Sequence, residues 1–255
     1  MLLASWNLNS IRAREERLLA WLERRQPDVV CLQELKCTED QFPFEAIEAV
    51  GYQAIVHGQK TYNGVAILSK SDPTDVSTGF GDGGDESQAR VIAATIDGVR
   101  IISVYVVNGG EIDSGKYAYK LKWLKRLENY LAAQDCTAQL AICGDYNIVP
   151  HERDVKNHDD WWGGVLYNKD LDAWFKRFID LGLQDTLRIH HKEAEIYSWW
   201  DYRMLAFPKN NGLRIDFILA TNKLAARSAD AGVDRDERKG KKPSDHAPVF
   251  AEFHD

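Results

Sequence analysis

The chain has 255 residues, of which 44% are hydrophobic and 28% charged, and its formal net charge is −7. These values are ordinary for a soluble globular protein, and no apolar run approaches the roughly 20 residues that span a bilayer. The negative charge argues against a protein that binds nucleic acid only by neutralising phosphates. It does not argue against an enzyme whose bound cation reverses the local charge.

The first 33 residues predict a strand, a helix and a second strand. Residues 2–6 and 28–33 are short apolar runs, as in buried strands. Between them, residues 12–25 carry leucines at helical spacing, and Pro27 ends the helix. This order predicts an α/β layer arrangement.

The rest of the chain alternates apolar, β-branched runs with two amphipathic segments. We expect strands at 52–57, 64–69, 90–96, 99–106, 139–143, 196–200, 214–220 and 247–253, and helices at 117–133 and 171–181. The glycine- and aspartate-rich stretch 79–85 should be an exposed loop. No linker divides the chain, so we expect one domain, residues 1–255, with two packed sheets and helices outside them. It is conceivable that the chain has two halves with a similar order of strands and helices.

The cysteines give no sign of a zinc site. Cys31, Cys37, Cys136 and Cys143 show neither a CxxC pair nor a Cys/His spacing. Cys31 and Cys143 lie in apolar runs, as buried free thiols do. Together with the absence of a signal-peptide pattern, this favours a cytoplasmic protein.

Polar residues stand where the predicted strands begin or end. The set is Asn7, Asn9, Gln33, Glu34, Asp145, Asn147, Asp216, Ser244, Asp245 and His246. Each alone has an ordinary structural explanation, such as a turn asparagine or a capping glutamate. An unpaired buried carboxylate is costly, however, so Asp216 within its apolar run needs a partner, for which His246 is the candidate.

The side chains of this set suit a site for a hard divalent cation. Mg²⁺ takes carboxylate and amide oxygens together with water, and Glu34, Asp245, Asn7 and Asn9 supply such oxygens. A cation on a phosphoryl oxygen stabilises the charge that builds up during hydrolysis.

The remaining residues suit the handling of water and phosphate. Asp145 can orient or deprotonate water, and an Asp216–His246 pair can fix the imidazole and favour its charged form. Asp145 and His246 are both plausible general bases. The whole set predicts phosphodiester hydrolysis.

With these residues, the sequence resembles the exonuclease III family of DNA-repair enzymes, within the wider endonuclease/exonuclease/phosphatase fold that also holds deoxyribonuclease I. The matching stretches are SWNLNSIRAR (5–14), PDVVCLQELK (27–36), GYQAIVHGQKTYNGVAILSK (51–70), ARVIAA (89–94), GDYN (144–147), GLQDTLR (182–188), YSWWDYR (197–203), GLRIDFILA (212–220) and PSDHAPV (243–249). They cover nearly the whole chain in family order.

The resemblance implies a four-layer α-β-β-α sandwich of two mixed sheets and a Mg²⁺ site, with Mn²⁺ as a substitute. Glu34 would be the principal metal ligand, with Asn7, Asn9 and Asp245 beside it. The number of metal ions stays open.

The resemblance also assigns roles around the phosphate. Asp145 and Asn147 would position the water and the phosphate, and Asp216 would orient His246 toward the scissile phosphate.

The family's active-site tyrosine motif, Tyr-x-Pro-(Asn/Gln)-Gly, appears here as Tyr105-Val106-Val107-Asn108-Gly109. Tyr105 and Asn108 match the motif, and Val107 stands where the family has proline.

The family encloses an extruded abasic sugar with an aromatic and an apolar residue, a form of selection by base flipping. Trp199, Leu213 and Ile215 match these positions, and of the adjacent Trp199 and Trp200 one should lie in the core.

The segment 157–175 departs from the family pattern. Asn157 matches a phosphate-contacting position, but bulky Leu166 and Tyr167 stand where small residues are common. Bulky side chains there would hinder binding of an intact duplex and favour binding of a 3′ end. The pair Trp161–Trp162 would either stack on exposed bases or pack within a loop.

The leading hypothesis is a monomeric, metal-dependent nuclease of DNA repair that cuts at abasic sites, removes 3′-blocking groups or 3′ nucleotides, or does both. A variant of it acts mainly as a 3′-phosphatase and 3′-exonuclease with weak abasic-site incision. Two alternatives are a phosphatase or lipid phosphodiesterase of the same fold and a non-catalytic scaffold that binds damaged DNA.

Overall fold

Two six-stranded mixed sheets form the centre of the protein, whose computed structural model describes residues 1–254. The first sheet has the order β11 (Ser228–Val233), β12 (Val249–Phe253), β1 (Leu2–Asn7), β2 (Val29–Gln33), β4 (Val65–Ser69), β3 (Gln53–His57). The second has the order β5 (Thr74–Thr78), β6 (Val91–Ile96), β7 (Val99–Tyr105), β8 (Leu140–Asp145), β10 (Asp216–Thr221), β9 (Leu183–Asp185).

The two sheets repeat one pairing pattern. In each, a central parallel pair, β1–β2 or β7–β8, is flanked on both sides by antiparallel strands. The two sheets match in topology but are not two halves of the chain, because the first sheet joins β1–β4 to β11 and β12 from the other end of the sequence. Each sheet places the carboxyl ends of its two parallel strands at the same edge.

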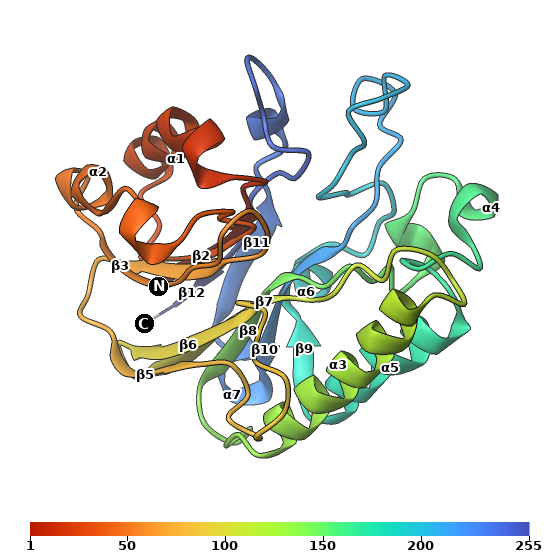
Figure 1. The fold of residues 1–255 in the computed structure, drawn as a ribbon, viewed down its shortest axis with the longest axis horizontal. Coiled ribbons are helices and arrows are strands. Elements are labelled where there is room, and N and C mark those ends of the chain that lie inside the picture. The colour runs from red at the N-terminus through yellow and green to blue at the C-terminus, as the bar shows by residue number, and fades with distance from the viewer. Residues whose placement is uncertain (255) are drawn as a thin grey trace.

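Helices cover the outer face of each sheet (Figure 1). Helices α1 (Ile11–Arg25) and α2 (Phe44–Ala49) pack on the first sheet, and α3 (Gly115–Ala132) and α5 (Lys169–Asp180) pack on the second. Short helices lie in the connections: α4 (His158–Trp161), α6 (Thr186–His190), α7 (Asn222–Ala225), and the 3₁₀ turns Glu39–Gln41, Glu152–Asp154 and Arg235–Arg238. The expected four-layer sandwich is confirmed.

An apolar core fills the space between the sheets. It takes side chains from both, including Leu3 and Ile67 of the first sheet and Ile101 and Ile218 of the second. The predicted burial of Cys31 and Cys143 is confirmed, and both are free thiols. Burial of each large aliphatic side chain contributes about 1.5–3 kcal/mol, so this core holds the two sheet edges in fixed relation.

Gly144 is required by the close approach of β7 and β8. Its φ is +152°, and a Cβ atom at this position would lie 1.9 Å from the carbonyl oxygen of Val104. The glycine immediately before Asp145 therefore lets the parallel pair close at the point where the strand ends.

The expected strand at 196–200 was wrong. Only isolated bridges occur there, from Trp199 to Leu213 and to His246. Trp199 packs into one side-chain cluster and Trp200 into another, so the segment is held by its side chains instead of a strand ladder.

Several short elements were not predicted, namely α2, β5, β9, β11, α4, α6, α7 and the 3₁₀ turns. Strand β5 is exposed along its length and β11 (SADAGV) lacks apolar alternation, so neither carries a hydrophobic signal. The predicted loop at 79–85 is present, with Gly79 buried and residues 81–85 exposed. Within residues 1–254, no helix combines the length and apolar character needed to cross a membrane.

Candidate active site

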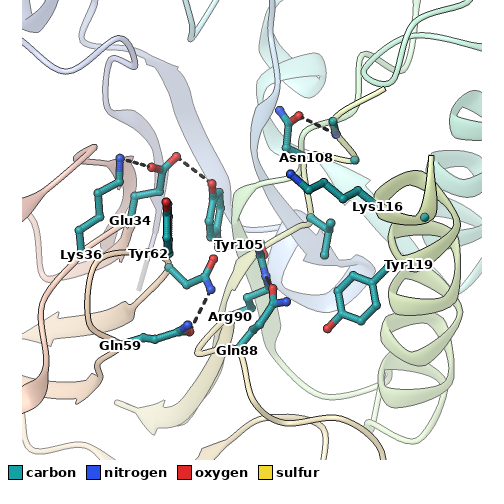
Figure 2. Close-up of a pocket in the computed structure, with 15 residues that line it drawn as sticks. Glu34, Lys36, Gln59, Tyr62, Gln88, Arg90, Tyr105, Asn108, Lys116 and Tyr119 are labelled. Atoms are coloured by element: carbon teal, nitrogen blue, oxygen red, sulfur yellow. Dashed lines mark hydrogen bonds and ion pairs between the residues drawn. The ribbon is translucent and has the colours of Figure 1, made fainter. Parts of the chain in front are cut away.

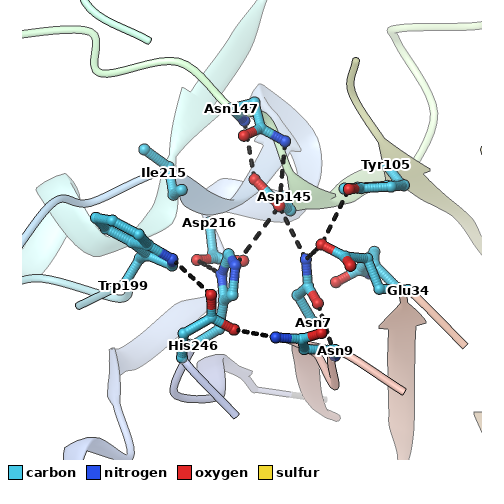
Figure 3. Close-up of polar contacts among 12 residues, drawn as sticks. Asn7, Asn9, Glu34, Tyr105, Asp145, Asn147, Trp199, Ile215, Asp216 and His246 are labelled. Atoms are coloured by element: carbon cyan, nitrogen blue, oxygen red, sulfur yellow. Dashed lines mark hydrogen bonds and ion pairs between the residues drawn. The ribbon is translucent and has the colours of Figure 1, made fainter. Parts of the chain in front are cut away.

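Polar side chains from both sheets meet at the edge where the parallel strands end (Figure 3). Strand β1 ends at Asn7, β2 ends one residue before Glu34, and β7 and β8 end at Tyr105 and Asp145. Ligands of α/β proteins commonly bind at such strand ends. The two matching sheets therefore bring four chemically active positions into one site.

Glu34 is the centre of the hydrogen-bond network on the side of the first sheet. Its Oε1 accepts hydrogen bonds from Asn7 Nδ2 and from the Tyr105 hydroxyl, both at 2.9 Å. Its Oε2 lies 2.9 Å from Lys36 Nζ. Burial acts to raise the pKa of Glu34, but Lys36 and Asn7 hold it below its usual value, so the side chain is a carboxylate.

The predicted metal ligands Asn9 and Asp245 are connected to Glu34 through Lys36. Asn9 Nδ2 donates to Asp245 Oδ1 at 2.9 Å, and Asn9 Oδ1 accepts from Lys36 Nζ at 2.6 Å. Oxygens of Glu34 and Asn9 thus converge on a positive charge. This donor set fits a hard divalent cation.

His246 lies between two buried carboxylates. Its Nδ1 is 2.8 Å from Asp216 Oδ2 and its Nε2 is 3.7 Å from Asp145 Oδ2. Burial lowers its pKa, but Asp216 and Asp145 outweigh burial and raise the pKa to about 10. The expected Asp216–His246 pair is confirmed, and the imidazole is a cation at neutral pH.

Asp145 is fully enclosed. Burial raises its pKa to about 7, and His246 opposes this shift. Asp145 Oδ2 accepts hydrogen bonds from Asn7 Nδ2 at 2.9 Å and from Asn147 Nδ2 at 3.2 Å. Asn108 Nδ2 donates to Asn147 Oδ1 at 3.0 Å, which brings Asn108 into the same network.

Glu34, Asp145 and His246 each offer a ligand atom, and these atoms lie within 4.8 Å of one another.

The three residues matched to a sugar pocket lie next to this cluster. Trp199 Nε1 donates to Asp245 Oδ2 at 3.0 Å, and the Trp199 ring packs edge-on against Trp161 at 5.7 Å between centroids. Leu213 and Ile215 are buried beneath them. Their role in binding a sugar stays a prediction.

Part of the divergent segment packs in the same cluster as these residues. Leu166 and Tyr167 are 7% and 4% exposed and belong to the same cluster as Leu213 and Ile215. Asn157 is exposed, and its Nδ2 donates to Asn211 Oδ1 at 3.2 Å, so no hydrogen bond joins it to the catalytic cluster.

A cavity of about 590 Å³ lies beside Glu34 and Tyr105 (Figure 2). Its cationic lining residues are Lys36, Arg90 and Lys116. A positively charged hollow next to the carboxylates suits a phosphate-bearing substrate and offsets the negative net charge locally.

Lys36, Arg90 and Ser198 also belong to the site, although the sequence alone indicated no role for them. Ser198 Oγ donates to Asp216 Oδ2 at 2.6 Å, and Arg90 lies over the Tyr105 ring at 4.6 Å and donates to the Tyr105 carbonyl oxygen. The role of Lys36 could have been inferred from the sequence, because Lys36 stands two residues after Glu34 in the stretch PDVVCLQELK (27–36). Ser198 and Arg90 carry no local signal of their partners.

Replacement of Asp216 by asparagine should lower the pKa of His246. The wild-type pKa is raised, so the stabilising contribution of the charged pair is complete below about pH 6.5 and is lost as pH rises through about 10. In ¹⁵N-histidine NMR of the metal-free protein, His246 should not titrate between about pH 6 and pH 8.5, whereas Asp216→Asn should bring its titration into that range. A wild-type His246 that titrates near its ordinary value would contradict this geometry.

Comparison with known proteins agrees with the fold and the site. The model of the Endonuclease/Exonuclease/phosphatase family matches residues 4–246. The chain is 38% identical to exodeoxyribonuclease III of Haemophilus influenzae, with 98% of each chain covered.

Solved structures give the same result. The 3′ phosphatase NExo from Neisseria, bound to a product DNA hairpin, is 42% identical with a TM-score of 0.97, and 100% of this chain and 99% of that chain are covered. An AP endonuclease from Archaeoglobus fulgidus is 39% identical with a TM-score of 0.96, and 99% of each chain is covered. The chain therefore belongs to the endonuclease/exonuclease/phosphatase family and, within it, to the exonuclease III group of phosphodiester-hydrolysing nucleases.

Proposed function

We propose that the protein is a Mg²⁺-dependent nuclease of DNA repair that hydrolyses phosphodiester or phosphomonoester bonds at damaged sites and 3′ ends of DNA. The observation that carries this proposal is the convergence of Glu34, Asp145 and His246 within 4.8 Å where the parallel strands end. The names of its relatives support the DNA substrate, since they include an exodeoxyribonuclease, a 3′ phosphatase with product DNA and an AP endonuclease.

The cation would be held by Glu34, with Asn7, Asn9 and Asp245 beside it. When bound, Mg²⁺ polarises a phosphoryl oxygen and neutralises developing charge. The oxygens that already surround Lys36 Nζ support this placement.

His246 would bind the phosphate as a cation, and Asp145 would be the general base. Both ring nitrogens of His246 face carboxylates, which raise its pKa and favour the protonated imidazole, and a protonated imidazole cannot accept a further proton. Asp145, whose pKa is raised to about 7, is matched to accepting a proton from water near neutral pH. Tyr105 and Asn147 would orient the phosphate from the opposite side.

The packing of the divergent segment favours 3′ termini over internal abasic sites. Leu166 and Tyr167 pack in one buried cluster with Leu213 and Ile215, which match the family's sugar-binding positions, so their bulk would restrict a sugar within a continuous strand. A terminal phosphate has no following nucleotide to accommodate. Internal abasic incision remains the second candidate activity, since Trp199, Leu213 and Ile215 all match the family's sugar-binding positions.

We also propose that the protein is a monomer and that it works in a reducing, cytoplasmic compartment. The four free cysteines support the compartment.

Replacement of Glu34 by glutamine should abolish cleavage without unfolding the protein. The change removes a ligand charge, so cleavage of a nicked duplex carrying a 3′ phosphate should fall by at least about a hundredfold, and excess EDTA should have the same effect on the wild type. Glu39→Gln, at an exposed position in a nearby 3₁₀ turn, is the matched control.

Full activity of Glu34→Gln, or wild-type activity in EDTA, would refute a metal site at Glu34. Damaged-DNA binding without any cleavage would support a non-catalytic scaffold. Preferred hydrolysis of phospholipid or inositol phosphate would support a phosphatase or lipid phosphodiesterase of the same fold.

Replacement of Tyr167 by alanine should shift the balance of activities. Wild-type protein with Mg²⁺ is assayed on three duplexes: an internal abasic site, a nick with a 3′ phosphate and a recessed intact 3′ end. We expect the 3′ phosphate to be the best substrate, and Tyr167→Ala to raise abasic incision relative to 3′-phosphate removal by about tenfold, because bulk over the pocket is removed. An unchanged ratio in a variant of wild-type helicity would show that Tyr167 does not restrict the pocket.

A further inference from the structure

Lys120 is a fully buried lysine on the apolar face of α3. Its relative exposure is 0%, and it lies on the same stripe as Tyr117, Trp123 and Leu127. Lysine is almost never fully buried unless its charge is satisfied. The surroundings of its ammonium group therefore show why it occupies this position.

The ammonium group joins three separate segments. Nζ donates to the carbonyl oxygens of Asn108 at 3.1 Å, Asn147 at 2.7 Å and Val165 at 2.6 Å. These three bonds use all three protons of a charged lysine. No carboxylate forms an ion pair with it anywhere in residues 1–254, so its three hydrogen bonds all go to backbone carbonyl groups.

Burial of a cation without a paired anion is costly in free energy. Burial lowers the pKa of Lys120 to about 7, and Asp145 opposes this shift. A methionine of similar length would fill the same space without that cost. The position of the charge therefore calls for a role beyond packing.

Each of the three carbonyl groups belongs to a segment of the proposed site. Asn108 and Asn147 are joined by their side-chain amides at 3.0 Å, and Asn147 continues the network to Asp145. Val165 immediately precedes Leu166 and Tyr167. One charged group thus ties the phosphate-binding asparagines to the segment that covers the sugar pocket.

Gly109 makes this arrangement possible. Its φ is +104°, and a Cβ atom there would lie 3.1 Å from Lys120 Cδ and 3.3 Å from Tyr117 Cδ2. The residue after Asn108 therefore has no side chain because its backbone passes directly over the lysine.

We infer that Lys120 is a positioning residue of the phosphate site, whose ammonium fixes the Asn108 and Asn147 loops and the segment at Val165 in the arrangement that binds a DNA phosphate. This inference rests on the proposed function. It requires that Lys120 act through Asn147 and its network and not through general stability.

The test is a double-mutant cycle in the full-length protein with Mg²⁺ and a nicked duplex carrying a 3′ phosphate. Lys120→Met should lower kcat/KM by at least about tenfold, which corresponds to about 1.4 kcal/mol. In an Asn147→Ala background, the same change should cost less than about threefold, because the group that it positions is already absent. Lys122→Met, an exposed lysine on the same helix, is the matched control and should be neutral.

The inference is overturned if Lys120→Met is as active as the wild type. It is also overturned if Lys120→Met costs the full tenfold in the Asn147→Ala background. If Lys120→Met does not fold, Gly109→Ala enters the same cycle, since it disturbs the lysine from the loop side, and it must show the same coupling to Asn147. If the wild type cuts none of the DNA substrates, the proposed function is refuted. If the wild type cuts DNA and Lys120→Met has no effect, only the inference about Lys120 is refuted.

Discussion

The structure depends on one buried charge cluster that crosses from sheet to sheet. His246 stands just before β12 of the first sheet, while Asp216 and Asp145 belong to β10 and β8 of the second. A buried cation is costly in free energy unless opposite charge or oriented dipoles lie close by. The 2.8 Å contact to Asp216 and the 3.7 Å approach of Asp145 therefore hold the two sheet edges together at the site.

The matching topology of the two sheets explains why the site forms at this edge. Each parallel pair directs its carboxyl ends the same way, and face-to-face packing brings Asn7 and Glu34 opposite Tyr105 and Asp145. Negative charge collects where the strands end, and cations gather around it: Lys36 between Glu34 and Asn9, Arg90 against Tyr105, and Lys120 behind Asn147. This arrangement explains how a chain with net charge −7 can offer a surface for phosphate.

Much of this arrangement was predictable because it follows from strong local signals. Apolar runs marked the central strands, and the cost of burying Asp216 pointed to His246 as its partner. Other parts had no such signal. The exposed strand β5 and the short β11 lack alternation, and the tryptophans at 199 and 200 suggested a strand although their side chains pack into different clusters. Lys120 carries no local signal of its role, because its three partners are backbone carbonyl groups distant in sequence.

In the proposed function, metal and phosphate meet at these strand ends. Anomalous diffraction from crystals grown with Mn²⁺ and a nicked duplex that carries a non-hydrolysable 3′-phosphate analogue tests it most directly. We expect a manganese peak at about 2.0–2.2 Å from a Glu34 carboxylate oxygen, with the phosphate analogue between His246 and Asn147. A manganese ion that does not contact Glu34, or a phosphate bound away from His246, would contradict it.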